Sequence, residues 1–234
     1  DCVIMLEDAE VLDDGLIAVY KAAPPGANLI FRGDDVRPGD VLLTAGTRLT
    51  TAHIGSLAAM GYTAVSVRRQ PRAAVISTGD ELVPAGEDLP LGKIRDVNAP
   101  MLAQAVLEAG GRADFLGIIP DRIEEVRAAL KSALADHDLV LLSGGTSVGE
   151  KDAVPQVLSE QGELLAHGLA VKPGKPTLFG SAGGKPVFGL PGNPVAAFFM
   201  FHWLARPLMA SMLGTELDER RMWAPERTRQ QMKH

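Results

Sequence analysis

A chain of 234 residues, 46% of them hydrophobic, is long enough for one sizeable domain and a smaller module. Its net charge of −6, with acidic and basic residues interspersed and no basic stripe among aromatics, excludes general nucleic-acid binding. A single cysteine, Cys2, excludes an internal disulfide and a cysteine-cluster metal site, so we expect a reducing, cytoplasmic setting. The first residues carry no pattern typical of an export signal.

Residues 1–70 predict a smaller, β-rich module that is incomplete at its N-terminus. Short apolar runs between Gly, Pro and Asp turns indicate strands at residues 2–6, 16–20 and 28–32, and a further turn and strand within residues 35–50. Residues 51–60 are apolar at helical spacing and precede Gly61, so we expect a helix there. Residues 63–69 return to a strand pattern, and Pro71 marks the expected boundary.

Residues 72–214 predict an α/β domain with a mainly parallel sheet and helices on both faces. The expected order is strand 73–78, helix 100–109, strand 112–119, helix 122–134, strand 138–143, helix 154–161, short strands at 177–181 and 185–190, and a helix from about 194 to 212.

The longest apolar run, residues 195–205, contains a histidine and is too short to cross a bilayer, so it predicts a buried helix and no membrane partner. Residues 215–234 are mixed in charge without a clear apolar face and predict a C-terminal tail.

Four unusual loops follow predicted strands of the α/β domain. They are "STGDEL" (77–82), "GIIPD" (117–121), "LSGGTSVGEKD" (142–152) and "GLPGNP" (189–194). Ligands of open α/β sheets bind outside the carboxyl ends of the strands, so these loops predict one cleft.

The third loop predicts a phosphate site. Its glycines, Gly144, Gly145 and Gly149, allow backbone N–H groups to approach an anion, hydroxyls add donors, and a helix N-terminus follows. The spacing matches neither a Walker loop nor a dinucleotide fingerprint. Asp152 has the alternative of capping the following helix, and Asn193 before Pro194 has the same alternative.

Charged residues near these loops predict cation and oxyanion binding. Asp80, Glu81 and Asp121 would place carboxylates beside the phosphate, which favours Mg²⁺, although each acid alone is also typical of a solvated turn. Lys172 and Lys175 flank a stiff Pro-Gly turn and would bind an oxyanion if they face the cleft. The alternative is a hairpin with exposed lysines.

Six segments together, "TGDEL", "GKIRDVNAPML", "LGIIPD", "LSGGTSVGEKD", "VKPGKP" and "GLPGNP", resemble the molybdopterin molybdenumtransferases, the family of MoeA and the gephyrin E-domain. The resemblance covers residues 72–214 and extends through "RGDDVRPGDVLLTAG" into the first module. It implies a molybdopterin-binding domain and Mg²⁺-dependent insertion of molybdate into adenylylated molybdopterin, with release of AMP. It also implies a homodimer whose cleft the partner subunit completes.

Matching motifs place the family's functional residues on this chain. The resemblance implies catalytic roles for Asp35, Glu81, Asp121, Asp152, Lys172 and Lys175, with the metal at Glu81, Asp121 and Asp152. The expected cofactor-binding residues are Thr78, Gly79, Asp80, Ser143, Gly144, Gly145, Ser147, Gly149, Pro173, Gly174, Pro191, Gly192, Asn193 and Pro194.

The chain departs from the family's pattern at two places. Gly168 stands where some members carry a lysine four residues before Lys172, and residues 215–234 do not provide the β-barrel domain with which family enzymes continue. Two other functions stay open. One is molybdopterin adenylyltransferase, which normally lacks a β-rich module like residues 1–70, and the other is a non-catalytic pterin-binding or scaffold protein.

Overall fold

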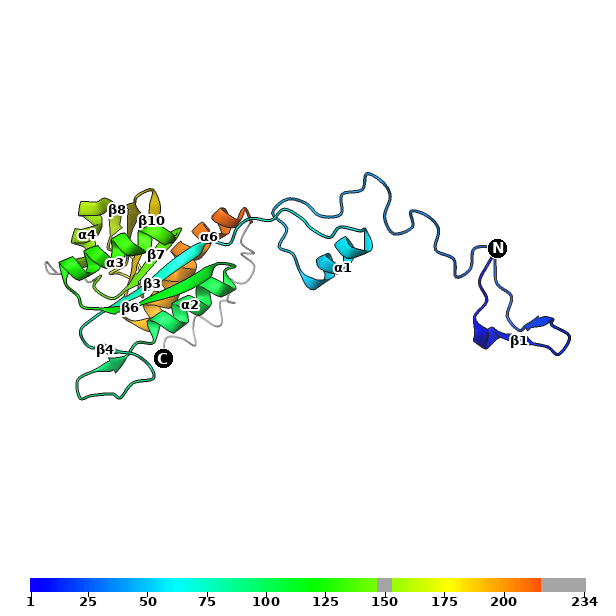
Figure 1. The fold of residues 1–234 in the computed structure, drawn as a ribbon, viewed down its shortest axis with the longest axis horizontal. Coiled ribbons are helices and arrows are strands. Elements are labelled where there is room, and N and C mark those ends of the chain that lie inside the picture. The colour runs from blue at the N-terminus through cyan, green and yellow to red at the C-terminus, as the bar shows by residue number, and fades with distance from the viewer. Residues whose placement is uncertain (147–152, 216–234) are drawn as a thin grey trace. The chain divides into compact units, whose positions relative to one another are not determined.

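A computed structural model describes residues 1–146 and 153–215 of the chain. The chain divides into two compact units, Asp1–Ala45 and Gly46–His234. The boundary expected at Pro71 falls inside the second unit. Figure 1 shows the chain as a ribbon coloured from blue at the N-terminus to red at the C-terminus.

The unit Asp1–Ala45 is built around one hairpin. A short 3-10 helix, η1 (Leu6–Asp8), leads into β1 (Ala9–Val11), which pairs antiparallel with β2 (Ile17–Val19). The strand expected at 16–20 is therefore confirmed, while those expected at 2–6, at 28–32 and within 35–50 are wrong. Side-chain hydrogen bonds stabilise turns in residues 28–32 and 35–50 instead of strands. Asp34 Oδ2 accepts the N–H of Phe31 at 2.7 Å, and Asp40 Oδ2 accepts the N–H of Arg37 at 2.8 Å.

The second unit begins with the predicted helix, α1 (Thr51–Ala59), whose N-terminus is closed by a capping box between Thr50 and His53. It ends before Gly61, which adopts a φ of 82°. The strand expected at 63–69 is wrong, because those residues pair with no other strand and run as irregular chain into β3.

A six-stranded sheet in the order β6-β3-β7-β10-β9-β8 forms the centre of this unit. Its strands are β3 (Arg72–Thr78), β6 (Arg112–Ile119), β7 (Leu139–Ser143), β8 (Gly162–His167), β9 (Leu178–Ala182) and β10 (Lys185–Leu190). The neighbours β6, β3, β7 and β10 are parallel, while β9 is antiparallel to both β10 and β8. The mainly parallel sheet is thus confirmed, with β8 as an additional strand.

Helices cover both faces of the sheet, as predicted (Figure 1). Successive residues of β3 point to opposite faces: Ala73 and Val75 pack against α2 (Asn98–Glu108), α5 (Pro194–Met200) and α6 (Arg206–Leu213). Ala74 and Ile76 pack against α3 (Ile123–Asp136) and α4 (Ala153–Gln161). Strands buried on both faces read as continuous apolar runs, which explains the sequence of β3.

The last helix is continuous from Pro194 to Leu213, because a π-helical turn, η2 (Phe201–Ala205), joins α5 to α6. By length and composition alone it could cross a membrane, but a buried core helix meets the same test. Phe201, Ala205 and Met209 are fully buried against the sheet, so the predicted core helix is confirmed.

Candidate functional site

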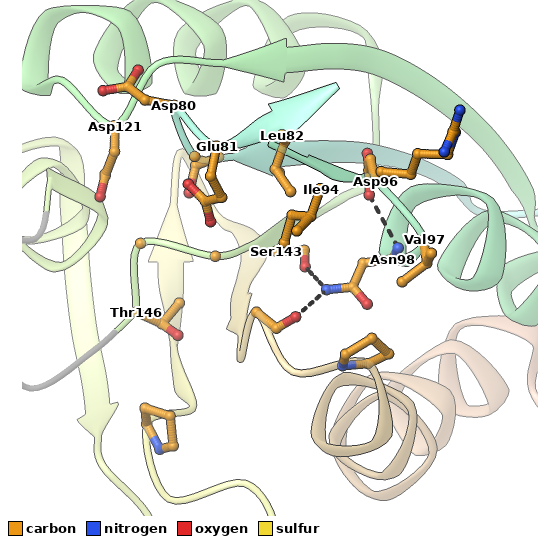
Figure 2. Close-up of a pocket in the computed structure, with 18 residues that line it drawn as sticks. Asp80, Glu81, Leu82, Ile94, Asp96, Val97, Asn98, Asp121, Ser143 and Thr146 are labelled. Carbon is orange, nitrogen blue, oxygen red and sulfur yellow. Dashed lines mark hydrogen bonds between the residues drawn. The ribbon is translucent and has the colours of Figure 1, made fainter. Parts of the chain in front are cut away.

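The connections of the sheet open a crevice at the carboxyl end of β3. The chain leaves β3 for α2 on one face, whereas the neighbouring strands β6 and β7 lead to α3 and α4 on the other. A pocket of about 550 Å³ lies there, lined by residues from the loops after β3, β6, β7 and β10 (Figure 2). The four loops were predicted to converge on one cleft, and their described residues do line one pocket.

The loop after β3 brings Thr78, Gly79, Asp80 and Glu81 to the pocket. Gly79 has a φ of 150°, and a Cβ on it would lie 2.6 Å from Glu81 Oε2. Because Gly79 has no side chain, the Glu81 carboxylate can fold back against the loop.

Two glycines bring the loop after β7 against the loops after β3 and β6. Gly144 and Gly145 have φ values of 94° and 57°. A Cβ on Gly144 would lie 2.3 Å from the carbonyl oxygen of Thr78, and one on Gly145 would lie 2.8 Å from Thr78 Oγ1 and 2.9 Å from Asp121 Oδ1. Thr78, Asp121 and the glycine loop therefore share one corner of the pocket. No other residue type fits both glycine positions without moving the backbone.

The loop after β10 forms another side of the pocket through Gly192 and Pro194. Asn193 Oδ1 accepts a hydrogen bond from Ala196 N at 3.1 Å, so the capping role proposed for Asn193 is confirmed. Pro191, which directly follows β10, is buried.

A parallel pair of short strands, β4 (Leu82–Val83) and β5 (Ile94–Arg95), supplies apolar walls through Leu82 and Ile94. Arg95 Nε donates to Ala85 O at 3.0 Å and Lys93 Nζ donates to Asp80 O, which closes the intervening loop on itself. We call residues 82–95 the strap.

Asp96 and Asn98, at the start of α2, also line the pocket, although sequence reasoning assigned them no role. Asp96 Oδ1 accepts from the N–H groups of Asn98 and Ala99 at 3.0 and 3.1 Å. Asn98 Nδ2 donates to Ser143 Oγ at 2.7 Å and Gly192 O at 2.9 Å (Figure 2). The signal was present in "RDVNAPML", where an aspartate precedes a helical pattern, as helix caps do.

The predicted lysines lie beside the pocket rather than among its described lining residues. Gly174 is buried, and a Cβ on it would meet Met200 Sδ at 2.5 Å, so the Pro173–Gly174 turn packs on α5. Pro176 lines the pocket, while Lys172 and Lys175 are exposed.

The remaining predicted site residues are not brought to the pocket by the described structure. Asp35 is exposed in the unit Asp1–Ala45. Ser147, Gly149 and Asp152 lie outside the described residues. Within residues 1–146 and 153–215, no group of three His, Cys, Asp or Glu side chains could hold a metal ion.

Several curated proteins and solved structures similar to this chain carry molybdopterin in their names. The chain is 39% identical over 214 residues to a molybdopterin molybdenumtransferase of Haemophilus influenzae, which covers 92% of this chain and 53% of that protein. It is 34% identical over 220 residues to one of Bacillus subtilis, with 92% and 51% covered. A crystal structure of a molybdopterin biosynthesis MoeA protein from Pyrococcus horikosii is 41% identical, with a TM-score of 0.78, over 93% of this chain and 54% of that chain.

The chain spans about half the length of the curated relatives it matches. A family model described as a probable molybdopterin binding domain matches residues 74–211, which is more than half of the chain and includes the pocket. A second, described as the MoeA N-terminal region (domain I and II), matches residues 1–61. The chain therefore belongs to the MoeA family of molybdopterin-binding proteins.

Proposed function

We propose that this protein inserts molybdate into adenylylated molybdopterin in a Mg²⁺-dependent step that releases AMP. The observation that carries the proposal is the corner of the pocket where Gly144 and Gly145 bring the loop after β7 against Thr78 and the Asp121 carboxylate, with Glu81 on the same rim. An anion-binding loop beside carboxylates suits a phosphorylated substrate held with a cation.

The chain's own residues perform binding and orientation. In the glycine loop after β7, the N–H of Gly144 already donates to Leu190 O at 3.1 Å, so the N–H of Gly145 is the proposed phosphate donor. Leu82, Ile94 and Pro194 give apolar surface for the flat pterin ring. The dithiolene sulfurs of the substrate ligate the metal, so the protein needs no thiolate of its own. Glu81 positions the incoming nucleophile at the rim.

Mg²⁺ is expected at Glu81 and Asp121, with Asp152 as the third predicted ligand. The donor set fits this ion, because Mg²⁺ binds proteins through one or two carboxylates and completes its shell with substrate phosphates and water. A complete cage of protein ligands is therefore not required. When bound, Mg²⁺ would neutralise the phosphate charge of the substrate.

Lys172 and Lys175 are proposed to stabilise the charge of molybdate or phosphate at the mouth of the pocket. Lys172 lies two residues before Gly174, which packs on α5. Lys175 directly precedes Pro176, which lines the pocket. Their exposure leaves the ammonium groups able to move toward an incoming oxyanion.

A cytoplasmic homodimer is the proposed assembly, with Asp35 acting on the cleft of the partner subunit. None of residues 1–70, all of which the structure describes, is buried. Large apolar side chains stand exposed there, among them Leu6, Val11, Ile30 and Val41. A protein surface with this much uncovered apolar area favours association, and a second copy is the occupant we propose.

The direct test is AMP release from adenylylated molybdopterin by the 234-residue chain, with and without molybdate and Mg²⁺. Release that requires both supports the proposal. Tight pterin binding without release would contradict it and favour a binding or scaffold function.

Glu81→Gln removes one charge from the rim and should reduce AMP release at least about tenfold while pterin binding remains. Glu87→Gln, on the exposed part of the strap and outside the pocket lining, is the matched control and should retain the wild-type rate. Equal rates for both variants would remove Glu81 from the reaction.

A further inference from the structure

Asp96 is a buried carboxylate with half of its hydrogen-bonding capacity unused. Asp96 is 5% exposed and lines the pocket. Oδ1 accepts the two N–H groups at the start of α2, whereas Oδ2 has no hydrogen-bond partner among the described residues. A buried carboxylate oxygen without a donor is costly in the folded protein, so its retention in a pocket points to a ligand.

Asn98 presents a second unused acceptor in the same pocket. Its residue is 6% exposed, and its Nδ2 donates to both Ser143 Oγ and Gly192 O. A carbonyl oxygen can only accept, so the contact with Gly192 fixes the amide orientation and leaves Oδ1 as the acceptor. Oδ1 has no partner within the described part of the chain.

The other residues that line the pocket define the shape and chemistry of the ligand group. Leu82, Ile94, Val97, Pro176 and Pro194 supply apolar lining. Apolar walls with a few fixed polar groups suit a flat ring, and two fixed acceptors require that the edge of this ring carry N–H donors.

We propose that Asp96 Oδ2 and Asn98 Oδ1 accept hydrogen bonds from the 2-amino and ring N–H groups of the pterin, and so determine which heterocycle the pocket takes. This inference rests on the proposed function, which supplies a pterin as the substrate. Asp96 thereby has two roles, since one oxygen caps α2 and the other faces the ligand edge.

The test compares two ligands on the full chain by isothermal titration calorimetry. Neopterin monophosphate carries the 2-amino group, and the matching lumazine phosphate has a carbonyl oxygen in its place. Wild-type protein should bind the pterin at least about tenfold more tightly, because the lumazine would set a carbonyl oxygen against a carboxylate.

Asp96→Asn is the informative variant. Asparagine caps a helix as well as aspartate does, so α2 should be retained, but the amide can turn a donor toward the ligand. The preference for pterin should fall to about twofold or less, through loss of pterin affinity and gain of lumazine affinity. Asp88→Asn is the control, because it removes the same charge from an exposed residue of the strap. This variant should keep the wild-type preference for the pterin.

The outcomes separate this inference from the proposed function. If the wild type binds neither pteridine, the proposed pterin substrate fails. If it binds the pterin but Asp96→Asn keeps the full preference, only the assignment of Asp96 fails. Guanine carries the same amino and oxo groups on its pyrimidine ring as a pterin, so GMP is the third ligand. Binding of GMP more tightly than neopterin monophosphate would overturn the assignment to a pterin.

Discussion

Gly79 controls the position of the Glu81 carboxylate at the rim of the pocket. The Cα of Gly79 lies so close to this carboxylate that an added Cβ would be 2.6 Å from Oε2. Its φ of 150° is also a conformation that residues with side chains rarely adopt. The loop after β3 therefore depends on glycine both for its backbone and for the place of its acid.

Gly79→Ala should displace the Glu81 carboxylate and lower AMP release at least about tenfold, since small shifts of catalytic groups have large effects on rate. The strained backbone should cost about 1–3 kcal/mol of unfolding free energy. Rate measurements combined with urea denaturation separate the two effects.

Gly86→Ala is the control for this substitution. Gly86 lies on the exposed strap, has no heavy atom within 4 Å of an added Cβ and does not adopt a positive φ. It should change neither rate nor stability. If Gly79→Ala behaves in the same way, the position of Glu81 does not depend on Gly79.

At this scale the sequence predicted acids that directly follow apolar strands, and missed those that do not. Glu81 and Asp121 lie just beyond β3 and β6, so strand pattern and topology place them together. Asp96 follows the strap instead, and only the tertiary structure brings α2 to the pocket. The packing of Gly174 on Met200, two residues after the exposed Lys172, is likewise a contact that no local pattern contains.

The N-terminus of the continuous helix from α5 to α6 is stabilised by its cap residue, Asn193. Asn193 Oδ1 accepts the N–H of Ala196, and Pro194 occupies the first helical position. Asn193→Ala should lower the free energy of unfolding by about 1 kcal/mol, whereas Asn193→Ser should preserve most of it. Equal stability of the two variants in urea denaturation would show that the cap contributes nothing.

Asp138 ties the irregular chain before β3 to the amino ends of the strands. It accepts two hydrogen bonds from the Arg69 guanidinium, at 2.7 and 2.9 Å, and one from Arg72 N at 2.8 Å. The Arg69 guanidinium, and then the Arg72 N–H, hold the pKa of the Asp138 carboxyl below its usual value, against an opposing effect of burial.

Asp138→Asn should lower the unfolding free energy by about 1 kcal/mol at pH 7, a value discounted because Arg69 is exposed. A lowered carboxyl pKa stabilises the fold above the unfolded-state pKa of about 4, and this stabilisation disappears as the pH falls through the folded-state pKa. The difference between wild type and Asp138→Asn should therefore shrink below about pH 4. A difference that stays constant from pH 7 to pH 3 would contradict the charged role.

Apart from β8, the sequence predicted the strands of the six-stranded sheet in the α/β domain correctly. Most strands predicted in residues 1–70 are wrong, because those segments have no neighbouring strand to pair with. The apolar run of β3 is buried between two layers of helices, so its pattern alone identifies it. Residues 28–32 also contain an apolar run, but Asn28 adopts a φ of 57° and Asp34 Oδ2 accepts the N–H of Phe31. Without a neighbouring strand, local turn chemistry decides the conformation.

At the scale of the whole molecule, the contrast between a buried α/β core and 70 residues without any buried side chain predicts self-association. A segment that buries none of its side chains has no core of its own, so we expect its apolar side chains to be covered by another surface. Sedimentation velocity at micromolar concentration should give twice the 24.7 kDa mass of one chain.

Ile30→Asp tests whether residues 1–70 supply this interface. Ile30 is 83% exposed in one chain, so the charge costs little in a monomer but much at an apolar contact. The variant should shift the protein toward monomers and leave the urea midpoint of the α/β domain unchanged. Leu107 of α2 is 52% exposed, so Leu107→Asp introduces the same charge on the other unit and should leave the dimer intact. Dissociation by Leu107→Asp but not by Ile30→Asp would place the interface on the α/β domain. The proposal that residues 1–70 bring Asp35 to the cleft of the partner subunit would then be wrong.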